Sequence, residues 1–345
     1  MRELFLQAKA VAAELGPSTG IAAASAALVF LLFGWPWRAP RLRRTAVGGV
    51  LSASVGFLAG CWWLGVRPQW PPREDQDRLL LVLFPAVIVI ELVAAFLKPE
   101  IRNPKSEMGP SDFGFRISSF YQWLPWLLRL VVAATASRIL LHDSSYIADL
   151  SGPGTRQWTV EQTWQVLGGL AAALAGTWML LSWLSQREPG RAVPLAVAVA
   201  CAGTAVILML SGYASGGPLA MPLAGAVVGG LVASLVMKGT VPLDGLLGLG
   251  VVGLFAVIVI GRFFGELTWT NAALLLFAPL FCWLTELPLL HRLKPRLRAF
   301  AGVVLTAVPV AIALALAQQK FVEDSARTSP GSEEPSLEDY MNFGK

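Results

Sequence analysis

The amino-acid sequence predicts an all-α, polytopic integral membrane protein with about ten transmembrane helices. Of its 345 residues, 55% are hydrophobic and only 14% are charged, and the mean hydropathy is +0.61. A soluble domain carries about a quarter charged residues. Apolar runs of about 20 residues, long enough to cross the hydrocarbon core as helices, recur along most of the chain. These runs lack the alternation of polar and apolar residues that is typical of a membrane β-barrel.

Composition divides the chain into three parts. Residues 1–17 are helical in period but only weakly apolar, so we expect an amphipathic helix that lies in the membrane interface. A turn at Gly16 and Pro17 marks its end. Residues 18–320 hold the transmembrane helical bundle. Residues 321–345 are acidic and rich in Ser, Pro and Glu, which predicts a disordered tail.

The first four spans are expected at residues 19–37, 46–66, 78–97 and 117–141. The first is closed by the sequence Trp-Pro-Trp and a cluster of arginines. The second is rich in Gly, Ala and Ser, which favours close contact between helices. The polar, proline-rich loop Arg67–Asp77 follows it. The third span contains Pro85, and the fourth carries Arg129 near its middle.

The remaining spans are expected at residues 162–185, 192–213, 218–237, 241–261, 271–290 and 299–318. The seventh and eighth are rich in glycine, which again favours close helix contact. Asp244 lies near the start of the eighth span and Glu286 near the end of the ninth. Most tryptophans fall near span ends, as in the aromatic belts of membrane proteins. Trp123 and Trp126 instead lie within the fourth span, where they either line a cavity or, as we expect, pack against neighbouring helices.

Two segments, Leu79–Arg102 and Leu274–Arg298, resemble each other. Each contains an internal proline and a Glu-Leu pair and ends in the sequence Leu-Lys-Pro-x-apolar-Arg. Leucine-rich helices resemble one another by chance, but this shared basic sequence at the end of both segments is less common. The alternatives are therefore a chance resemblance and a parallel internal repeat, which would pair spans one to four with spans seven to ten.

The basic residues indicate the orientation in the membrane. The loops after the odd-numbered spans hold fifteen of them: Arg38, Arg41, Arg43, Arg44, Lys98, Arg102, Lys105, Arg116, Arg187, Arg191, Lys238, Arg292, Lys294, Arg296 and Arg298. The opposite loops and the N-terminal segment hold seven: Arg2, Lys9, Arg67, Arg73, Arg78, Arg156 and Arg262. The positive-inside rule makes the first set cytoplasmic. We therefore expect a multi-pass protein of the cell membrane, the inner membrane in a two-membrane cell, with both termini outside the cytoplasm.

Glu91 and Arg129 are the most informative charged residues, because a charge at the centre of a span costs about 2.5–3.5 kcal/mol on insertion scales. Glu91 lies seven residues, about 10 Å, before Lys98. Arg129 lies thirteen residues, about 20 Å, after Arg116. Because the two spans are adjacent and antiparallel, we expect the side chains to pair inside the bundle. The pair is either a substrate or proton site or a structural lock between two helices.

Glu286 and Asp244 complete the candidate substrate- or ion-binding residues. Glu286 precedes Pro288, a proline that frees a backbone carbonyl one turn earlier. Glu286 is therefore either a carboxylate that binds a coupling ion or proton in a broken helix, or a side chain that extends towards Arg292 at the interface. Asp244 lies in the first turn of its span and is either part of the site or a residue that favours the helix N-terminus. Arg262, at the end of the same span, is expected to be solvated.

Several classes of site are disfavoured. The cysteines, Cys61, Cys201 and Cys282, fall within spans and are expected to be buried apolar residues. The histidines, His142 and His291, lie at span ends, which argues against a bis-histidine haem or a histidine-rich metal centre. No catalytic residue, metal or cofactor is assigned. The net charge of +5 does not indicate nucleic-acid binding, because the basic residues lie at span ends.

Three functions remain open at this point. The first is a secondary transporter or flippase-like carrier of a small or amphipathic solute, favoured by the proline-interrupted spans and buried carboxylates. The second is a non-catalytic structural or assembly subunit of a larger membrane complex, which the scarcity of polar residues favours. The third, a lipid-modifying enzyme, is disfavoured by the lack of a His- and Asp-rich loop. The partners expected are the lipid bilayer, a small-molecule or lipid substrate, and other membrane proteins.

The basic asymmetry predicts that the loop Arg67–Asp77 and the acidic tail lie outside the cytoplasm. A single cysteine placed at either site, in a chain whose three native cysteines are replaced, should react with a membrane-impermeant maleimide in intact cells. Reaction only after lysis, at both sites, would reverse the predicted orientation.

Overall fold

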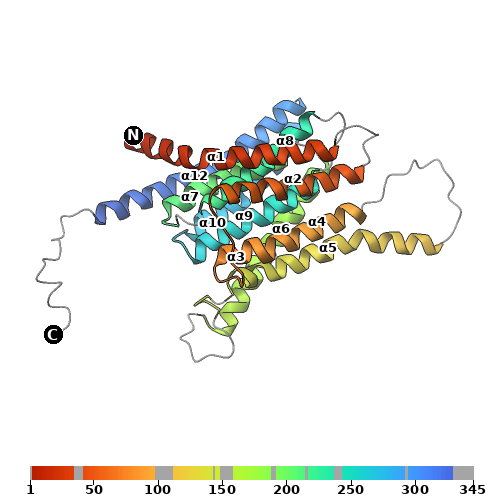
Figure 1. Cartoon of the computed structure of the whole chain (residues 1–345), viewed down its shortest axis with the longest axis horizontal. Coiled ribbons are helices and arrows are strands. Elements are labelled where there is room, and N and C mark those ends of the chain that lie inside the picture. The colour runs from red at the N-terminus through yellow and green to blue at the C-terminus, as the bar shows by residue number, and fades with distance from the viewer. Residues whose placement is uncertain are drawn as a thin grey trace, which may run out of the picture.

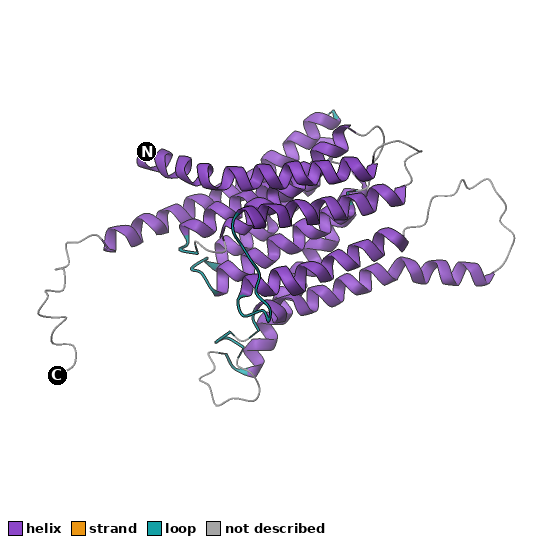
Figure 2. Cartoon of the chain, viewed as in Figure 1, coloured by secondary structure: helices purple, strands orange, loops and turns teal. Residues whose placement is uncertain are grey.

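The fold is a bundle of long helices, and every regular element in the described part of the chain is helical (Figure 2). The computed structural model describes residues 2–34, 42–97, 112–142, 144–147, 158–187, 192–213, 217–236, 243–291 and 294–328. Within these ranges, nine helices are long and apolar enough to cross a membrane. The predicted class, an all-α polytopic membrane protein, is confirmed.

The nine long helices follow the predicted order of spans. They are α1 (Arg2–Gly34), α2 (Leu42–Trp63), α4 (Phe84–Leu97) with the short elements α3 (Asp75–Arg78) and η1 (Leu79–Leu83) before it, α5 (Asp112–Leu140), α6 (Val160–Arg187), α7 (Ala192–Leu210), α8 (Ala220–Val236) after the single turn η2 (Gly217–Leu219), α9 (Asp244–Phe263) and α12 (Pro295–Thr328).

The ninth predicted span is broken into three pieces: α10 (Trp269–Phe277), the 3₁₀ helix η3 (Ala278–Glu286) and α11 (Pro288–His291). Pro279 stands at the start of η3 and cannot donate a helical hydrogen bond, which explains the change of helix type there. The nine residues of α10 and the nine of η3 reach about 13 Å and 18 Å. Together they match the hydrocarbon thickness of about 30 Å.

Pro85 has a comparable effect at the start of the third span. The five residues before Phe84 form a π-helical stretch, in which the Phe84 amide donates to the carbonyl of Leu79. A wider turn of this kind redistributes the hydrogen bonds around a proline that lacks its own N–H. The helix then continues regularly through Glu91.

Helix α9 lies at the centre of the bundle (Figure 1) and packs against α2, α4, α5, α6, α7, α8 and α10. In its membrane-spanning window 94% of the residues are buried. A helix that is apolar all round is expected in such a position. Its glycines let neighbouring side chains approach the backbone: Gly245 faces Val50, Gly248 faces Glu91, Gly250 faces Val197, Gly253 faces Leu223 and Gly261 faces Leu208.

A second close contact joins α1, α2 and α8. A Cβ atom on Gly56 of α2 would lie 2.6 Å from the Ala22 carbonyl oxygen of α1. A Cβ on Gly229 of α8 would overlap the Ala23 carbonyl of α1. Small residues therefore set the spacing of these three helices, as they do in many membrane bundles.

Two predicted boundaries differ from the structure. Helix α1 runs without a break through Gly16 and Pro17, where the sequence predicted a turn. Just after the proline, the Ser18 and Thr19 hydroxyls both donate to the Leu15 carbonyl, so the hydroxyls bond within the helix and do not cap a new one. Helix α12 continues to Thr328, so the helix extends past the boundary predicted at residue 320. The rest of the predicted tail, residues 329–345, lies outside the described residues.

The first turns of α1 and the last turns of α12 lie at the same end of the bundle, and the end of α4 and the start of α5 lie at the opposite end (Figure 1). This arrangement is the one expected for an even number of crossings. A tenth crossing by the broken α10–η3 segment stays a prediction, beside the nine helices of the described ranges that are long and apolar enough to cross a membrane.

The contact at Gly229 predicts a matched pair of variants. Gly229→Ala should lower the unfolding temperature of the purified chain, because the added methyl group meets backbone that cannot move independently of α1; overpacking of this kind costs about 1–3 kcal/mol. Gly20→Ala on α1, where a Cβ meets no atom within 4 Å, should leave the unfolding temperature unchanged. Equal effects of the two variants would show that α1 and α8 are not held at this distance.

Candidate functional site

Glu91 of α4 and Arg129 of α5 form a bidentate ion pair inside the bundle. Arg129 Nε donates to Glu91 Oε1 at 2.8 Å, and Nη2 donates to Oε2 at 2.8 Å. The side chains are 1% (Glu91) and 10% (Arg129) exposed. Two parallel charge-assisted bonds fix the carboxylate against the guanidinium and are stronger than neutral hydrogen bonds. The pairing predicted from the depths of the two residues is confirmed.

The central helix α9 forms one wall of this ion pair. A Cβ atom on Gly248 would lie 2.6 Å from Glu91 Oε1, so the carboxylate rests directly against the glycine backbone. Glu91 lies six residues before the end of α4, about 9 Å along the helix axis. At this depth neither charge reaches bulk water, and each depends on the other for compensation.

The other face of the Arg129 guanidinium contacts two tryptophans. Its Cζ atom lies 4.9 Å from the ring centre of Trp126, on the same helix, and 5.4 Å from that of Trp178, on α6. Both distances are within the range of cation–π attraction, which strengthens when the cation is removed from water. Arg129 is therefore held by a carboxylate on one side and by aromatic rings on the other.

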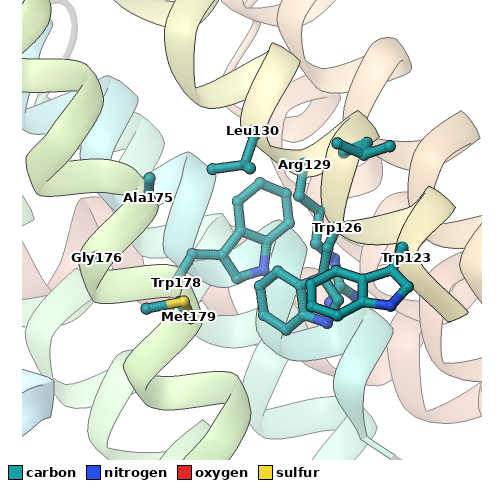
Figure 3. A pocket seen from close by; sticks show the side chains of 9 residues that line it. Trp123, Trp126, Arg129, Leu130, Ala175, Gly176, Trp178 and Met179 are labelled. Atoms are coloured by element: carbon teal, nitrogen blue, oxygen red, sulfur yellow. The ribbon is translucent and has the colours of Figure 1, made fainter.

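Arg129 also forms the inner end of a groove between α5 and α6 (Figure 3), with a volume of about 400 Å³. Apart from Arg129, the lining is apolar or aromatic: Trp123, Trp126, Leu127, Leu130, Ala175, Gly176, Trp178 and Met179. The outer residues Trp123 and Met179 are 67% and 55% exposed. Because α5 and α6 are both long and apolar enough to cross a membrane, we expect this exposed edge to face lipid.

Hydrogen-bond donors at the inner end of the groove have no protein partner among the described residues. Glu91 engages Nε and Nη2 of Arg129, and Nη1 makes no hydrogen bond. The indole Nε1 of Trp178 is buried and also has no partner; Figure 3 shows this nitrogen on the groove side of the ring. A buried donor without a partner costs roughly 1–3 kcal/mol, so the Trp178 N–H favours a bound molecule that carries an acceptor oxygen, and Arg129 Nη1 offers a second donor beside it.

A second hollow of about 320 Å³ extends the groove towards the end of α6, lined by Trp126, Met179, Leu180, Trp183 and Gln186. Trp183 is stacked on Trp283 of η3, with ring centres 4.6 Å apart. The broken ninth span therefore contacts a residue that lines this second hollow, although no residue of η3 lines it directly.

Asp244 lies at the start of α9, one helical turn before Gly248 and on the same face. Its Oδ1 accepts a hydrogen bond of 3.4 Å from the Ser185 hydroxyl at the end of α6. It is thus one turn from the glycine that contacts Glu91, and its predicted role in binding stays a prediction.

Glu286 is the last residue of η3, and the structure does not join it to the ion pair by any hydrogen bond within the described ranges. Its Oε1 is buried without a partner. Arg292, the expected interfacial partner, lies outside the described residues. In the same ranges no three His, Cys, Asp or Glu side chains gather as they would around a metal ion.

The sequence did not indicate Trp178 or Gly248 as parts of the site. Trp178 lies on a helix whose rotation about its axis the sequence leaves open, although a buried cation in a tryptophan-rich protein was a signal to look for such a contact. Arg262, predicted to be solvated, is instead only partly exposed and is stacked on Trp269, with 4.7 Å between Cζ and the ring centre.

No protein-family model matches the chain, and no curated protein matches its sequence.

Removing one partner of the ion pair should destabilise the protein more than removing both. Glu91→Gln leaves a buried, uncompensated guanidinium and should lower the free energy of unfolding by about 3–5 kcal/mol. Glu91→Leu combined with Arg129→Met should lower it less, because both desolvated charges are gone. Unfolding of the purified chain in mixed detergent micelles measures both.

The exposed pair Lys320–Glu266 provides the control, since its side chains are 41% and 70% exposed. Glu266→Gln should change the free energy of unfolding by less than about 1 kcal/mol. Equal losses in the Glu91 single variant and in the double variant would contradict the coupling of Glu91 and Arg129.

Proposed function

We propose that this protein is a flippase-like membrane carrier that takes an amphipathic molecule from the lipid into the groove between α5 and α6. The observation that carries the proposal is the position of Arg129, a buried cation at the inner end of an otherwise apolar groove whose outer edge faces lipid. A lipid-facing groove admits the apolar part of a ligand sideways from the bilayer, and Arg129 receives its polar part.

The charge of the site favours an uncharged or zwitterionic polar group. Glu91 already neutralises Arg129, so an added anion would leave net negative charge at a depth where charge is costly. The N–H groups of Arg129 Nη1 and Trp178 Nε1 require acceptors. An ester or amide carbonyl, or the phosphodiester of a zwitterionic head group, provides them without changing the net charge.

The moving part of the proposed carrier is the broken span. Short 3₁₀ segments within membrane helices often mark hinges, and discontinuous helices line the binding sites of many transporters. Through the stack of Trp183 on Trp283, η3 contacts the outer part of the groove. The proposed parallel repeat of spans one to four and seven to ten would make η3 the counterpart of the π-helical segment η1.

The runner-up function is a non-catalytic subunit of a membrane complex, in which the ion pair locks α4 to α5. The bidentate geometry of Glu91 and Arg129 favours it, because the carboxylate oxygens are both engaged and the pair is complete without a ligand. The groove and its unpartnered donors have no role in that function. An assay of lipid movement separates the two.

The full chain, reconstituted into phosphatidylcholine vesicles with a trace of fluorophore-labelled phosphatidylcholine, should expose the inner-leaflet probe to dithionite faster than protein-free vesicles do. Arg129→Gln, combined with Glu91→Leu to avoid an unpaired carboxylate, should slow this exposure by about tenfold or more, as loss of a charged hydrogen bond predicts.

Gly176→Leu provides a variant that fills the groove without touching the ion pair, since a Cβ there meets no atom within 4 Å. It should also slow the exposure, whereas Gly168→Leu, equally unhindered but outside the groove, should not. Wild-type rates equal to those of empty vesicles, or equal rates for both glycine variants, would reject the carrier and leave the subunit function.

A further inference from the structure

A second pocket lies between α6, α9 and α10, with a volume of about 300 Å³. It shares no lining residue with the groove between α5 and α6. Its polar groups are Arg262 and Gln165; the rest of the lining is apolar and includes Gly169, Phe255 and Trp269. The pocket therefore combines an apolar cavity with one cation at its rim.

The aromatic rings of Trp269 and Phe263 hold the Arg262 guanidinium in place without neutralising its charge. Its Cζ atom lies 4.7 Å from the ring centre of Trp269 and 5.9 Å from that of Phe263. Its Nε atom is buried and has no hydrogen-bond partner, and no ion pair to Arg262 occurs within the described part of the chain. In this respect Arg262 differs from Arg129, whose charge is compensated by Glu91.

Two acidic residues at the same end of the bundle bind groups other than Arg262. Glu266 accepts from Lys320 Nζ at 2.9 Å, and Glu161 accepts from the Gln165 amide at 3.2 Å. The Arg262 guanidinium therefore favours binding of an anion that does not belong to the chain. Arg262 stands in the last turn of α9, at the depth where lipid head groups meet the apolar core.

We propose that this pocket is a binding site for a lipid with an anionic, phosphate-containing head group. The guanidinium of Arg262 pairs with the phosphoryl oxygens, a match that arginine makes in bidentate fashion. An acyl chain occupies the apolar cavity beside Gly169 and Phe255. The apolar lining selects a lipid over free phosphate, and the uncompensated charge selects an anionic lipid over a zwitterionic one.

The site is independent of the proposed carrier activity. It lies along the first half of α6, whereas the groove lies along the second half. A lipid bound here joins α6 to α9 and α10, and its expected effect is to stabilise the bundle, since a ligand that binds only the folded state raises its stability by mass action.

The test uses the full chain in detergent micelles, to which phosphatidylglycerol or phosphatidylcholine with identical acyl chains is added. Phosphatidylglycerol should raise the unfolding temperature, and native mass spectrometry should show it bound; phosphatidylcholine should do neither at the same concentration. Arg262→Gln should weaken phosphatidylglycerol binding by about tenfold, the effect of losing a charge-assisted bond. Arg67→Gln should bind as the wild type does, because Arg67 lies over Trp62 at 5.7 Å but lines neither pocket.

A second pair of variants tests the same site if Arg262→Gln folds poorly. Gly169→Leu fills this pocket and Gly176→Leu fills the groove, and a Cβ at either glycine meets no atom within 4 Å. Gly169→Leu should abolish the phosphatidylglycerol effect and leave lipid movement intact, and Gly176→Leu should do the reverse. Undiminished phosphatidylglycerol binding by Gly169→Leu or Arg262→Gln, equal effects of the two lipids, or full stabilisation by inorganic phosphate alone would each overturn the proposal.

Discussion

The bidentate contact between Glu91 and Arg129 is the interaction on which the rest of the site depends. In hydrocarbon a single carboxylate or guanidinium is costly, so the two charges are tolerated because α4 and α5 bring them together. The pair then sets the rotation of both helices about their axes. That rotation places Trp126 and the guanidinium at the inner end of the groove, and it turns the carboxylate towards the backbone of α9 at Gly248.

Two arginines of the bundle, Arg129 and Arg262, illustrate how the neutralisation of a charge determines which ligand a pocket favours. Arg129 and Arg262 both lie against tryptophan rings and both line apolar pockets. Arg129 is neutralised from within the protein and so favours acceptors that carry no net charge. Arg262 has no acidic partner in the described ranges and so favours an anion. The same residue type therefore favours a ligand without net charge in one pocket and an anionic ligand in the other.

The sequence predicted the helical membrane class, the order of the spans and the pairing of Glu91 with Arg129, because hydropathy, span length and charge depth are properties of single segments or of adjacent ones. It did not predict that Trp178 contacts Arg129, since this depends on how α6 is rotated against α5. It also treated Arg262 as solvated, because proximity to a span end does not reveal a tryptophan from the next helix. Pro288 pointed to a broken ninth span, but the sequence did not predict that the nine residues from Ala278 to Glu286, which include Pro279 near their start and pack against α7 and α12, form a 3₁₀ helix.

The glycine positions of α9 have a consequence for how the protein is made. The side chains that fill them, Val50, Glu91, Val197, Leu208 and Leu223, all belong to helices that precede α9 in the chain. During synthesis these helices enter the membrane first, and each glycine position on α9 meets a side chain that is already present. Helices α10 and α12 follow and pack against an assembled core. The order of the helices along the chain is therefore also a workable order of assembly, with the most buried helix added after its partners and before the segments that cover it.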